Sequence, residues 1–130
     1  MAETYEHCLT PLQMVRAFHA KFGFTVNEKP TMVDERTWKI RFNSLLDETD
    51  ELKIASHEED LVAIADALGD ILYLVYGTGV AYGIDLDAVF KEIHRSNMTK
   101  SPAVEKDGKA VKGEGYSPPN LERLLKKAGA

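Results

Sequence analysis

Residues Leu61–Ile84 read LVAIADALGDILYLVYGTGVAYGI, a long apolar run in which only Asp66 and Asp70 are charged. The run is long enough to cross a bilayer. Two aspartates near its middle would each cost about 2.5–3.5 kcal/mol on membrane-insertion scales. Four glycines weaken a membrane helix further: Gly69, Gly77, Gly79 and Gly83. We therefore expect a buried helix of a soluble protein, with two functional carboxylates and no membrane span.

Apolar residues recur at helical spacing on the N-terminal side of this run. Thr10 is a good N-cap with Pro11 at the first helical position, and Gly23 is suited to end this first helix. Its apolar stripe consists of Leu12, Val15, Phe18 and Phe22. A second helix is expected from Asp34 or Glu35 to about Ala55. Its inward-facing residues are Trp38, Phe42, Leu45, Leu46 and Leu52.

Helical signals continue through the apolar run and beyond it. Ser56 followed by Glu59 matches the capping-box pattern and predicts a third helix over about 57–82, which Gly83 ends. A fourth helix is expected over about 85–96. Because the connections between these helices are short, antiparallel packing is expected. We therefore predict an all-α fold, an antiparallel four-helix bundle in a single domain over residues 1–130.

The composition changes after Lys100. The segment 104–111 centres on Asp107-Gly108, a dipeptide that strongly favours a short hairpin. A loop then leads into a short terminal helix that begins at Leu121. The sequence thus predicts a small C-terminal β-hairpin and loop appendage over about 101–119. Three lysines concentrate positive charge there: Lys106, Lys109 and Lys112. Such a cluster is most simply a solvated surface, and the alternative hypothesis is a lid that folds over an acidic groove and binds phosphate.

Composition and charge exclude several classes of protein. The 130 residues carry 16 Lys and Arg against 21 Asp and Glu, a net charge of −5, so a broad basic surface for duplex nucleic acid is not expected. The 44% hydrophobic and 28% charged fractions are typical of a soluble globular protein. Cys8 has no partner for an intrachain disulfide, and the N-terminus has no secretory signal. The expected location is the cytoplasm.

Three acids gather on the expected second helix. Glu48 borders the apolar stripe, Glu51 lies about 60° further round, and Asp47 lies beyond it. Like charges at these spacings repel each other, at a cost on the order of a few tenths of a kcal/mol. Taken alone, the cluster is most simply a solvated acidic face.

Asp66 and Asp70 change that interpretation, because they lie one turn apart on a helix that is otherwise apolar all round. Burying two unpaired aspartates requires a compensating charge. Salt bridges are one solution, and the candidate partners are Arg36, Arg41 and Arg95. A divalent cation such as Mg²⁺ is the other, since it takes carboxylate, water and phosphate oxygens as ligands.

The acidic segments resemble the ExxE…ExxD pattern of the all-α nucleoside triphosphate pyrophosphatases, which include MazG proteins, dimeric dUTPases and phosphoribosyl-ATP pyrophosphatases. They are LLDETDEL at 45–52 and DALGDILY at 66–73. Three later segments are similar to the C-terminal part of the phosphoribosyl-ATP pyrophosphatase-like branch. They are HRSNMTK at 94–100, DGKAVKG at 107–113 and YSPP at 116–119. The resemblance covers roughly residues 36–124.

By position, the resemblance implies that Glu48 and Glu51 are the ExxE acids and that Asp70 is the last acid of ExxD. The Glu expected three residues before Asp70 is replaced by Ala67, and Asp66 is the expected substitute. The implied cofactor is Mg²⁺, with Mn²⁺ as an alternative ion. Its expected ligands are Glu48, Glu51, Asp66 and Asp70.

The resemblance also implies roles for polar residues around the metal. Asp47 matches an extra acid before the ExxE motif and is the candidate that orients or deprotonates the attacking water. The expected catalytic set is Asp47, Glu48 and Glu51. Asn97 and Lys100 match positions that lie near substrate phosphates, and Lys112 of the hairpin is a further candidate for phosphate binding.

The implied reaction is Mg²⁺-dependent hydrolysis of a nucleotide between its α and β phosphates. The first hypothesis is a pyrophosphatase that acts on a nucleoside triphosphate, including noncanonical ones. The alternatives are the phosphoribosyl-ATP pyrophosphatase of histidine biosynthesis and a non-catalytic helical interaction module. Family members are dimers or dimers of dimers, so a homodimer or homotetramer is expected, with the third helix central to its interface.

Overall fold

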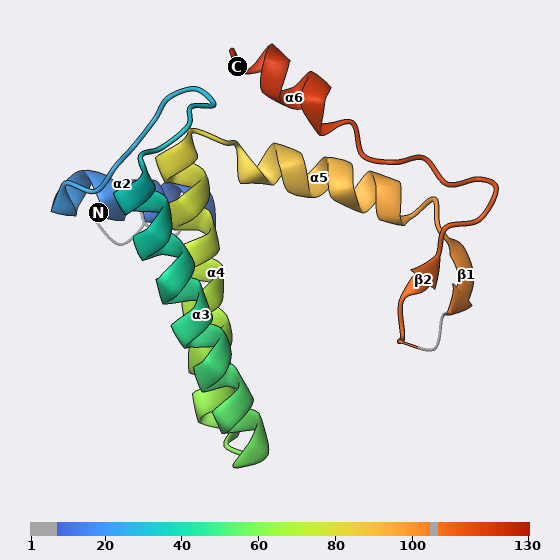
Figure 1. Cartoon of the computed structure of the whole chain (residues 1–130), viewed down its shortest axis with the longest axis horizontal. Helices are drawn as coiled ribbons and strands as arrows, with labels where there is room; N and C mark the ends of the chain where they lie inside the picture. Colours follow the sequence, from blue (N-terminus) through green and yellow to red (C-terminus); the bar gives the residue numbers. More distant parts are fainter. Residues whose placement is uncertain (1–7, 105–106) are drawn as a thin grey trace. The chain divides into compact units, whose positions relative to one another are not determined.

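The computed structural model of the chain describes residues 8–104 and 107–130, with the backbone alone at 103 and 104. The chain divides into two compact units, Met1–Ile84 and Asp85–Ala130. Figure 1 shows the helices α2, α3 and α4 of the first unit and the elements α5, β1, β2 and α6 of the second. The all-α class is confirmed, because the sheet has only two short strands among the described residues.

Helix α2 (Pro11–Phe22) begins and ends as the sequence predicts. The Thr10 hydroxyl accepts a hydrogen bond from the backbone N–H of Gln13, whose side chain accepts one from the Thr10 backbone N–H. These two bonds satisfy donors that the first turn of a helix leaves free. Gly23 ends the helix at a φ of 71°, in the left-handed region that glycine adopts without steric cost.

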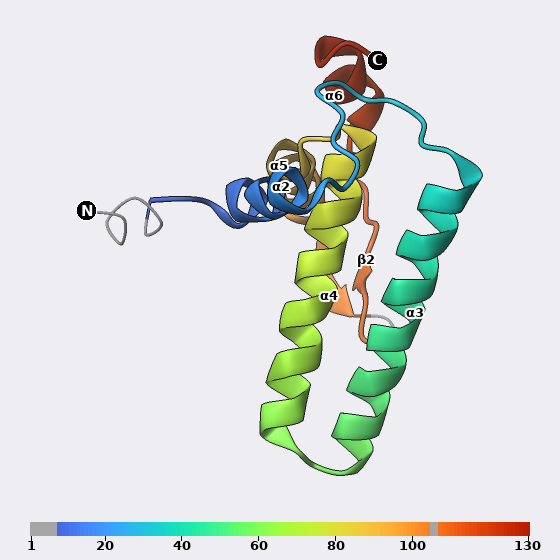
Figure 2. The same ribbon diagram turned by 90° about the vertical axis from the view of Figure 1, so that its left-hand side faces the viewer.

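Helices α3 (Glu35–His57) and α4 (Leu61–Tyr82) form an antiparallel pair that lies side by side in Figure 2. Asp34 caps α3 by accepting a hydrogen bond from the backbone N–H of Thr37 at 2.8 Å. Helix α4 ends at Gly83, whose φ is 70°. A β-carbon at Gly83 would lie 2.1 Å from the carbonyl oxygen of Lys29, so the close approach of the 27–30 turn also requires glycine.

The predicted start of α4 was wrong. Ser56 lies inside α3, where its hydroxyl donates a hydrogen bond to the Leu52 carbonyl at 2.7 Å. The chain turns through Glu59, which has a φ of 55°, and Asp60 caps α4 by accepting from the backbone N–H of Ala63 at 3.0 Å. The capping-box pattern at Ser56 misled because a second strong N-cap residue follows four positions later.

The second unit contains helix α5 (Leu86–Asn97), the antiparallel strands β1 (Ser101–Val104) and β2 (Ala110–Val111), and helix α6 (Leu121–Lys127). The hairpin lies where the sequence places it, and Gly108 has a φ of 82°. Lys106, one of the lysines of the expected lid, lies outside the described residues.

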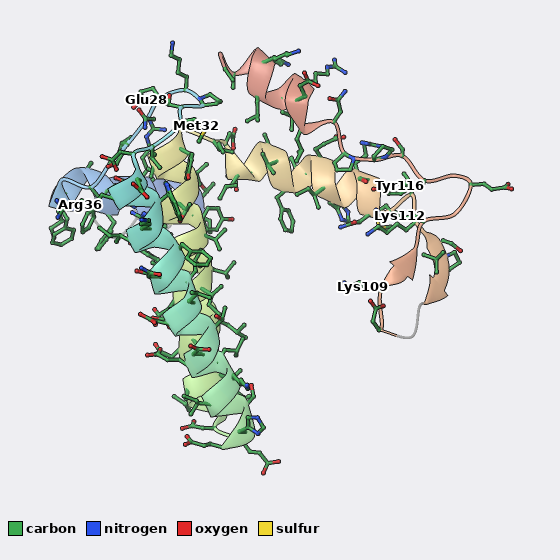
Figure 3. The ribbon with its side chains drawn as sticks, in the orientation of Figure 1. Glu28, Met32, Arg36, Lys109, Lys112 and Tyr116 are labelled. Atoms are coloured by element: carbon green, nitrogen blue, oxygen red, sulfur yellow. The ribbon has the colours of Figure 1, made fainter. Side chains whose placement is uncertain are left out.

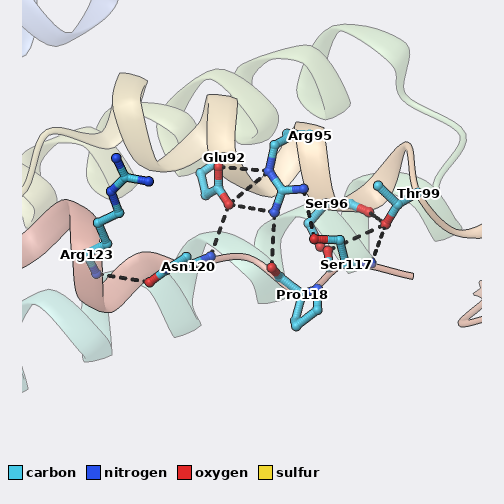
Figure 4. A network of polar contacts seen from close by, with 8 residues as sticks. All are labelled: Glu92, Arg95, Ser96, Thr99, Ser117, Pro118, Asn120 and Arg123. Atoms are coloured by element: carbon cyan, nitrogen blue, oxygen red, sulfur yellow. Dashed lines mark hydrogen bonds and ion pairs between the residues drawn. The ribbon is translucent and has the colours of Figure 1, made fainter. Parts of the chain in front are cut away.

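An ion-paired network joins α5 to the segment that precedes α6 (Figure 4). The guanidinium of Arg95 donates hydrogen bonds to the carboxylate of Glu92, to the hydroxyl of Ser117 at 3.1 Å and to the carbonyl of Pro118 at 3.0 Å. Glu92 also accepts from the backbone N–H of Asn120 at 3.0 Å. These contacts, and not a large apolar core, fix the path of the chain into α6.

The first unit has a core of small residues, and its large apolar side chains remain accessible. The buried apolar residues are Val15, Ala55, Ala67, Val80 and Ala81. Helix α4 is largely accessible in the single chain: an 18-residue stretch of it has a mean hydropathy of 1.5, and only 11% of that stretch is buried. The expected burial of this helix is therefore not reached within one chain. By length and composition alone, α4 could cross a membrane. The stripe on α3 is also open, with Phe42 54% and Trp38 40% exposed.

The predicted four-helix bundle is not confirmed. Helix α2 packs against α4, and α4 packs against α3, which gives a three-helix unit. Helix α5 belongs to the second unit and packs against α6. The apolar surface of α3 and α4 that a fourth helix was expected to cover is therefore accessible in the isolated first unit.

Candidate active site

One pocket of the first unit collects acids from two helices. Its volume is about 480 Å³, and α3 contributes Asp47, Glu48 and Glu51 while α4 contributes Asp70. The other lining residues are Phe18, Ser44, Tyr73 and Leu74. The antiparallel pairing of α3 and α4 thus brings together two acidic segments about twenty residues apart in sequence.

Glu48 is the electrostatic centre of this pocket. Its Oε2 atom is buried and is the one buried side-chain polar atom without a hydrogen-bond partner in the described part of the chain. Burial raises the pKa of Glu48 to about 7, and the carboxylates of Glu51, Asp70 and Asp66 act in the same direction. A carboxylate in this environment needs either a proton or a neighbouring cation.

No arginine compensates these acids. Among the ion pairs of residues 8–104 and 107–130, none involves Glu48, Asp66 or Asp70. Arg95 pairs with Glu92, and Arg41 donates a hydrogen bond to His19. The salt-bridge alternative for the two aspartates of α4 is therefore wrong in the described chain.

Asp66 occupies a different position from the other predicted metal ligands. It is exposed and does not line the pocket, although its charge contributes to the raised pKa of Glu48. Ala67, at the position of the missing acid, is only 2% exposed and so faces the packed side of α4. The acid at 66 therefore acts on Glu48 electrostatically from outside the pocket, one helical turn from Asp70.

The donor set of the pocket fits a hard divalent cation. Carboxylate oxygens are the ligands that Mg²⁺ prefers, and the buried Oε2 of Glu48 has no partner. Within the described ranges, however, no three His, Cys, Asp or Glu side chains already surround one point as ligands. The acids as they lie in the single chain therefore supply oxygen donors of the right kind but not a formed metal site.

The predicted phosphate-binding residues come together in the second unit. Asn97, Lys100 and Lys112 line one pocket of about 550 Å³, together with Lys109 and two apolar residues of β2. Figure 3 shows Lys109 and Lys112 on the hairpin. The ammonium of Lys112 lies 5.2 Å from the centre of the Tyr116 ring, so this aromatic face supports one side of a cationic pocket.

Sequence reasoning missed several residues around the acidic pocket. Phe18 was assigned to the apolar stripe of its helix, but it lines the pocket. Its ring packs edge-on against the Tyr73 ring, and the ring centres are 5.4 Å apart. Ser44 precedes Glu48 by four residues, a spacing that places both side chains on one face of α3. That spacing already places Ser44 on the edge of the acids from sequence alone, whereas the contact between Phe18 and Tyr73 depends on how α2 crosses α4.

Comparisons with known proteins agree with the motifs. A sequence profile described as phosphoribosyl-ATP pyrophosphohydrolase matches residues 15–97, which include both acidic segments. An uncharacterized protein of Acanthamoeba polyphaga mimivirus is 42% identical over 82 residues, 60% of this chain. The match covers 33% of the viral protein, so the chain spans about a third of the length of this curated relative. The chain belongs to the phosphoribosyl-ATP pyrophosphohydrolase family, within the all-α nucleoside triphosphate pyrophosphatase superfamily.

Proposed function

We propose that this protein is a Mg²⁺-dependent pyrophosphohydrolase that cleaves a nucleoside triphosphate, canonical or noncanonical, between its α and β phosphates. The family gives the general reaction, pyrophosphohydrolysis of a nucleotide. The observation that carries the proposal is the buried, unpartnered Oε2 of Glu48 in a pocket that three further acids line. Such a site repels a polyphosphate unless a cation is bound first.

Glu48, Glu51 and Asp70 would hold the ion, and Asp66 is proposed as a fourth ligand. Mn²⁺ is expected to substitute for Mg²⁺ in activity assays, because both ions take oxygen ligands. A bound ion supplies Lewis-acid polarisation of the phosphate and neutralises its charge. Glu48 binds a cation best as the ionised carboxylate. Because its raised pKa favours the protonated form near neutral pH, metal binding should release a proton from Glu48.

Asp47 is proposed to orient the attacking water and to accept its proton. Its side chain is exposed and lines the same pocket as Glu48, which gives solvent access and proximity to the acids. The water oxygen forms a bond to the α phosphorus, and the bond from that phosphorus to the α–β bridging oxygen breaks. Pyrophosphate leaves with the electron pair, and the products are pyrophosphate and a nucleoside monophosphate.

A further phosphate-binding role is proposed for the cationic pocket of the second unit. Lys100 and Lys112 offer ammonium charges, and Asn97 offers a neutral amide donor. Lys109 lines the same pocket and is added to this set. The cations give this acidic chain a local site for an anionic ligand, with no need for a broad basic surface.

We also infer that the protein is a homodimer or homotetramer in the cytoplasm. The large apolar side chains of α3 and α4 remain accessible in the single chain, including Phe42 and Leu72 at 54% and 59%. Apolar surface of this extent marks an interface, and a second copy of the same two helices would complete a four-helix arrangement. Covering α4 in this way keeps it in a soluble assembly, with no membrane as partner.

Phosphoribosyl-ATP is the second candidate substrate, because the matched family carries that description. The two enzyme hypotheses share the bond that is cleaved and differ in the nucleoside that the site must hold. A non-catalytic interaction module is the third hypothesis, and it predicts no hydrolysis of any nucleotide.

A nucleotide panel tests the proposal and separates these hypotheses. The panel contains canonical and noncanonical nucleoside triphosphates and phosphoribosyl-ATP, each assayed for pyrophosphate with Mg²⁺, with Mn²⁺ and with chelator. Asp50→Asn serves as the matched control for Glu51→Gln, because Asp50 is an exposed acid on α3 outside the pocket. We expect metal-dependent release by the wild type and by Asp50→Asn, and its loss in Glu51→Gln. No release from any nucleotide would leave only the interaction module.

A further inference from the structure

A buried junction of three helices holds a histidine and an arginine that the proposed mechanism does not use. Arg41 of α3 donates a hydrogen bond from Nη2 to Nε2 of His19 of α2 at 2.9 Å. His19 is 2% exposed, and its Nδ1 lies 2.8 Å from the carbonyl oxygen of Thr25. Because a guanidinium only donates, Nε2 must accept, and the ring proton therefore sits on Nδ1 and is donated to Thr25. His19 is the neutral tautomer in this arrangement.

The guanidinium of Arg41 has no anion beside it. Burial lowers the pKa of Arg41, and burial and the Arg41 charge lower the pKa of His19. Among the residues that the structure describes, no carboxylate forms an ion pair with Arg41. Partly buried arginines are normally paired with a carboxylate or a phosphate, so this charge is available to an anionic ligand.

The junction residues do not themselves line the acidic pocket, but each is close in sequence to a residue that does, on each of the three helices. Phe18, Ser44 and Leu74 line the pocket, while His19 follows Phe18 directly, Arg41 precedes Ser44 by one turn, and Gly77 follows Leu74 by one turn. Arg41 and Glu48 are seven residues apart on one face of α3, which is about 10 Å along the helix axis. A polyphosphate bound in the pocket would extend along α3 toward this arginine.

Gly77 makes room for the guanidinium. A β-carbon at this position would lie 2.6 Å from Nη1 of Arg41 and 2.9 Å from Nε2 of His19. The absence of a side chain on α4 therefore lets the arginine reach His19. Three helices thus hold one cation in a fixed orientation, about two turns of α3 from Glu48.

We propose that Arg41, oriented by His19, binds phosphate oxygens of the nucleotide in the acidic pocket, a role that rests on the proposed function. The planar guanidinium presents paired N–H donors that match phosphate oxygens, which a lysine does not reproduce. His19 is a positioning residue because it contacts Arg41 and not the substrate.

Binding of inorganic tripolyphosphate in the presence of Mg²⁺ tests this role without turnover or a nucleoside. Calorimetry on Arg41→Gln should give a dissociation constant raised by about tenfold, the effect of losing a charge-assisted contact of ~1.4 kcal/mol. Arg41→Lys should retain only part of the affinity. Arg36→Gln is the matched control, because it removes an exposed cation from the same helix outside the junction (Figure 3).

His19→Leu tests the positioning role. It should weaken tripolyphosphate binding and raise KM with little change in kcat, and the double variant with Arg41→Gln should bind no worse than Arg41→Gln alone. Circular dichroism checks the helical content of each variant, and His19→Gln, which retains an acceptor for Arg41, should keep most of the affinity. Folded Arg41→Gln with wild-type affinity for tripolyphosphate would overturn the inference.

The outcome is separable from that of the proposed function. Weaker tripolyphosphate binding by Arg41→Gln would support the Arg41 role even if no nucleotide in the panel were hydrolysed. Conversely, metal-dependent hydrolysis together with unchanged tripolyphosphate binding in Arg41→Gln would support the function and reject this role for Arg41. A KM that changes with the base while tripolyphosphate affinity does not would assign Arg41 to the nucleoside instead.

Discussion

Glu48 and Glu51 lie one helical turn apart on α3 and line the same pocket, where burial and the Glu51 carboxylate raise the pKa of Glu48 to about 7. Their arrangement is costly in the absence of a cation, because the buried Oε2 of Glu48 has no hydrogen-bond partner in the described chain. The same arrangement becomes favourable when a divalent ion neutralises both groups.

Glu51→Gln should reduce turnover by about a hundredfold or more, because a metal ligand is lost. The variant should retain its helical content, since Glu51 is exposed and makes no ion pair among the described residues. Steady-state kinetics and Mg²⁺ titration measure the two effects. Wild-type turnover in Glu51→Gln would remove this residue from the metal site.

The stability of the metal-free protein should fall as pH rises through about 7. The pKa of Glu48 in the folded state is above its ordinary value of 4.5, so the folded state binds this proton more tightly than the unfolded state does. Its contribution is fully present below pH 4.5 and is lost as pH rises through about 7. The free energy of unfolding, measured with urea in the presence of chelator at steps of about one pH unit from pH 5 to 8, tests this trend.

Glu48→Gln provides the control for the pH experiment, because it cannot ionise and should remove this part of the pH dependence. Mg²⁺ should restore stability to the wild type at pH above about 7, since an ion that binds the folded state stabilises it. Parallel stability curves for the two proteins from acid to alkaline pH would contradict the prediction.

Asp66→Ala tests whether Asp66 replaces the acid missing at Ala67. We expect weaker Mg²⁺ binding and a smaller loss of turnover than in Glu51→Gln, because Asp66 is exposed and outside the pocket. Titration with Mg²⁺, followed by kinetics at saturating Mg²⁺, compares the losses of affinity and turnover in the two variants. Unchanged values would mean that this chain has lost one ligand of the motif.

Arg95→Gln should destabilise the second unit with no direct effect on the acidic pocket. Arg95 holds the pKa of Glu92 at about 2, with help from the Asn120 backbone N–H. This contribution is present above the ordinary pKa of 4.5 and is lost as pH falls through about 2. Hydrogen exchange of α5 and α6 amides measures the change, and unchanged protection in Arg95→Gln would show that the network of Figure 4 contributes little.

A charged substitution on the exposed apolar face of α4 should dissociate the proposed oligomer. Leu72→Lys is suited to this test, because Leu72 is 59% exposed in the single chain and does not line the acidic pocket. Light scattering should give a multiple of 14.5 kDa for the wild type and a smaller mass for the variant. A wild-type mass of one chain at micromolar concentration would refute the assembly.

Most helix ends could be predicted from local chemistry. Thr10, Gly23 and Gly83 act where the sequence places them, because caps and left-handed glycines depend on a few neighbouring residues. The prediction that Ser56 caps α4 was wrong because Asp60 is a competing N-cap residue. The turn through Glu59 places Asp60, and not Ser56, at the start of the helix. The hairpin around Gly108 was predictable for the same local reason.

The apolar circumference of α4 indicated that one chain could not cover the helix on all sides, and its accessibility in the single chain agrees with that expectation. The acids of α3 and α4 were predictable as a shared group from spacing, since helical faces follow from sequence position. The junction of His19, Arg41 and Gly77 was not predictable, because it depends on how three helices meet. Likewise, Lys109 joins Asn97 in one pocket only through the fold of the hairpin.

The most direct test of the central claim is hydrolysis in water enriched in the heavy oxygen isotope, with mass spectrometry of both products. A Mg²⁺-dependent pyrophosphohydrolase that attacks the α phosphorus should place the heavy oxygen in the nucleoside monophosphate and leave the pyrophosphate unlabelled. Heavy oxygen in the pyrophosphate, release of single phosphate groups, or no products from any nucleotide with Mg²⁺ would contradict the account.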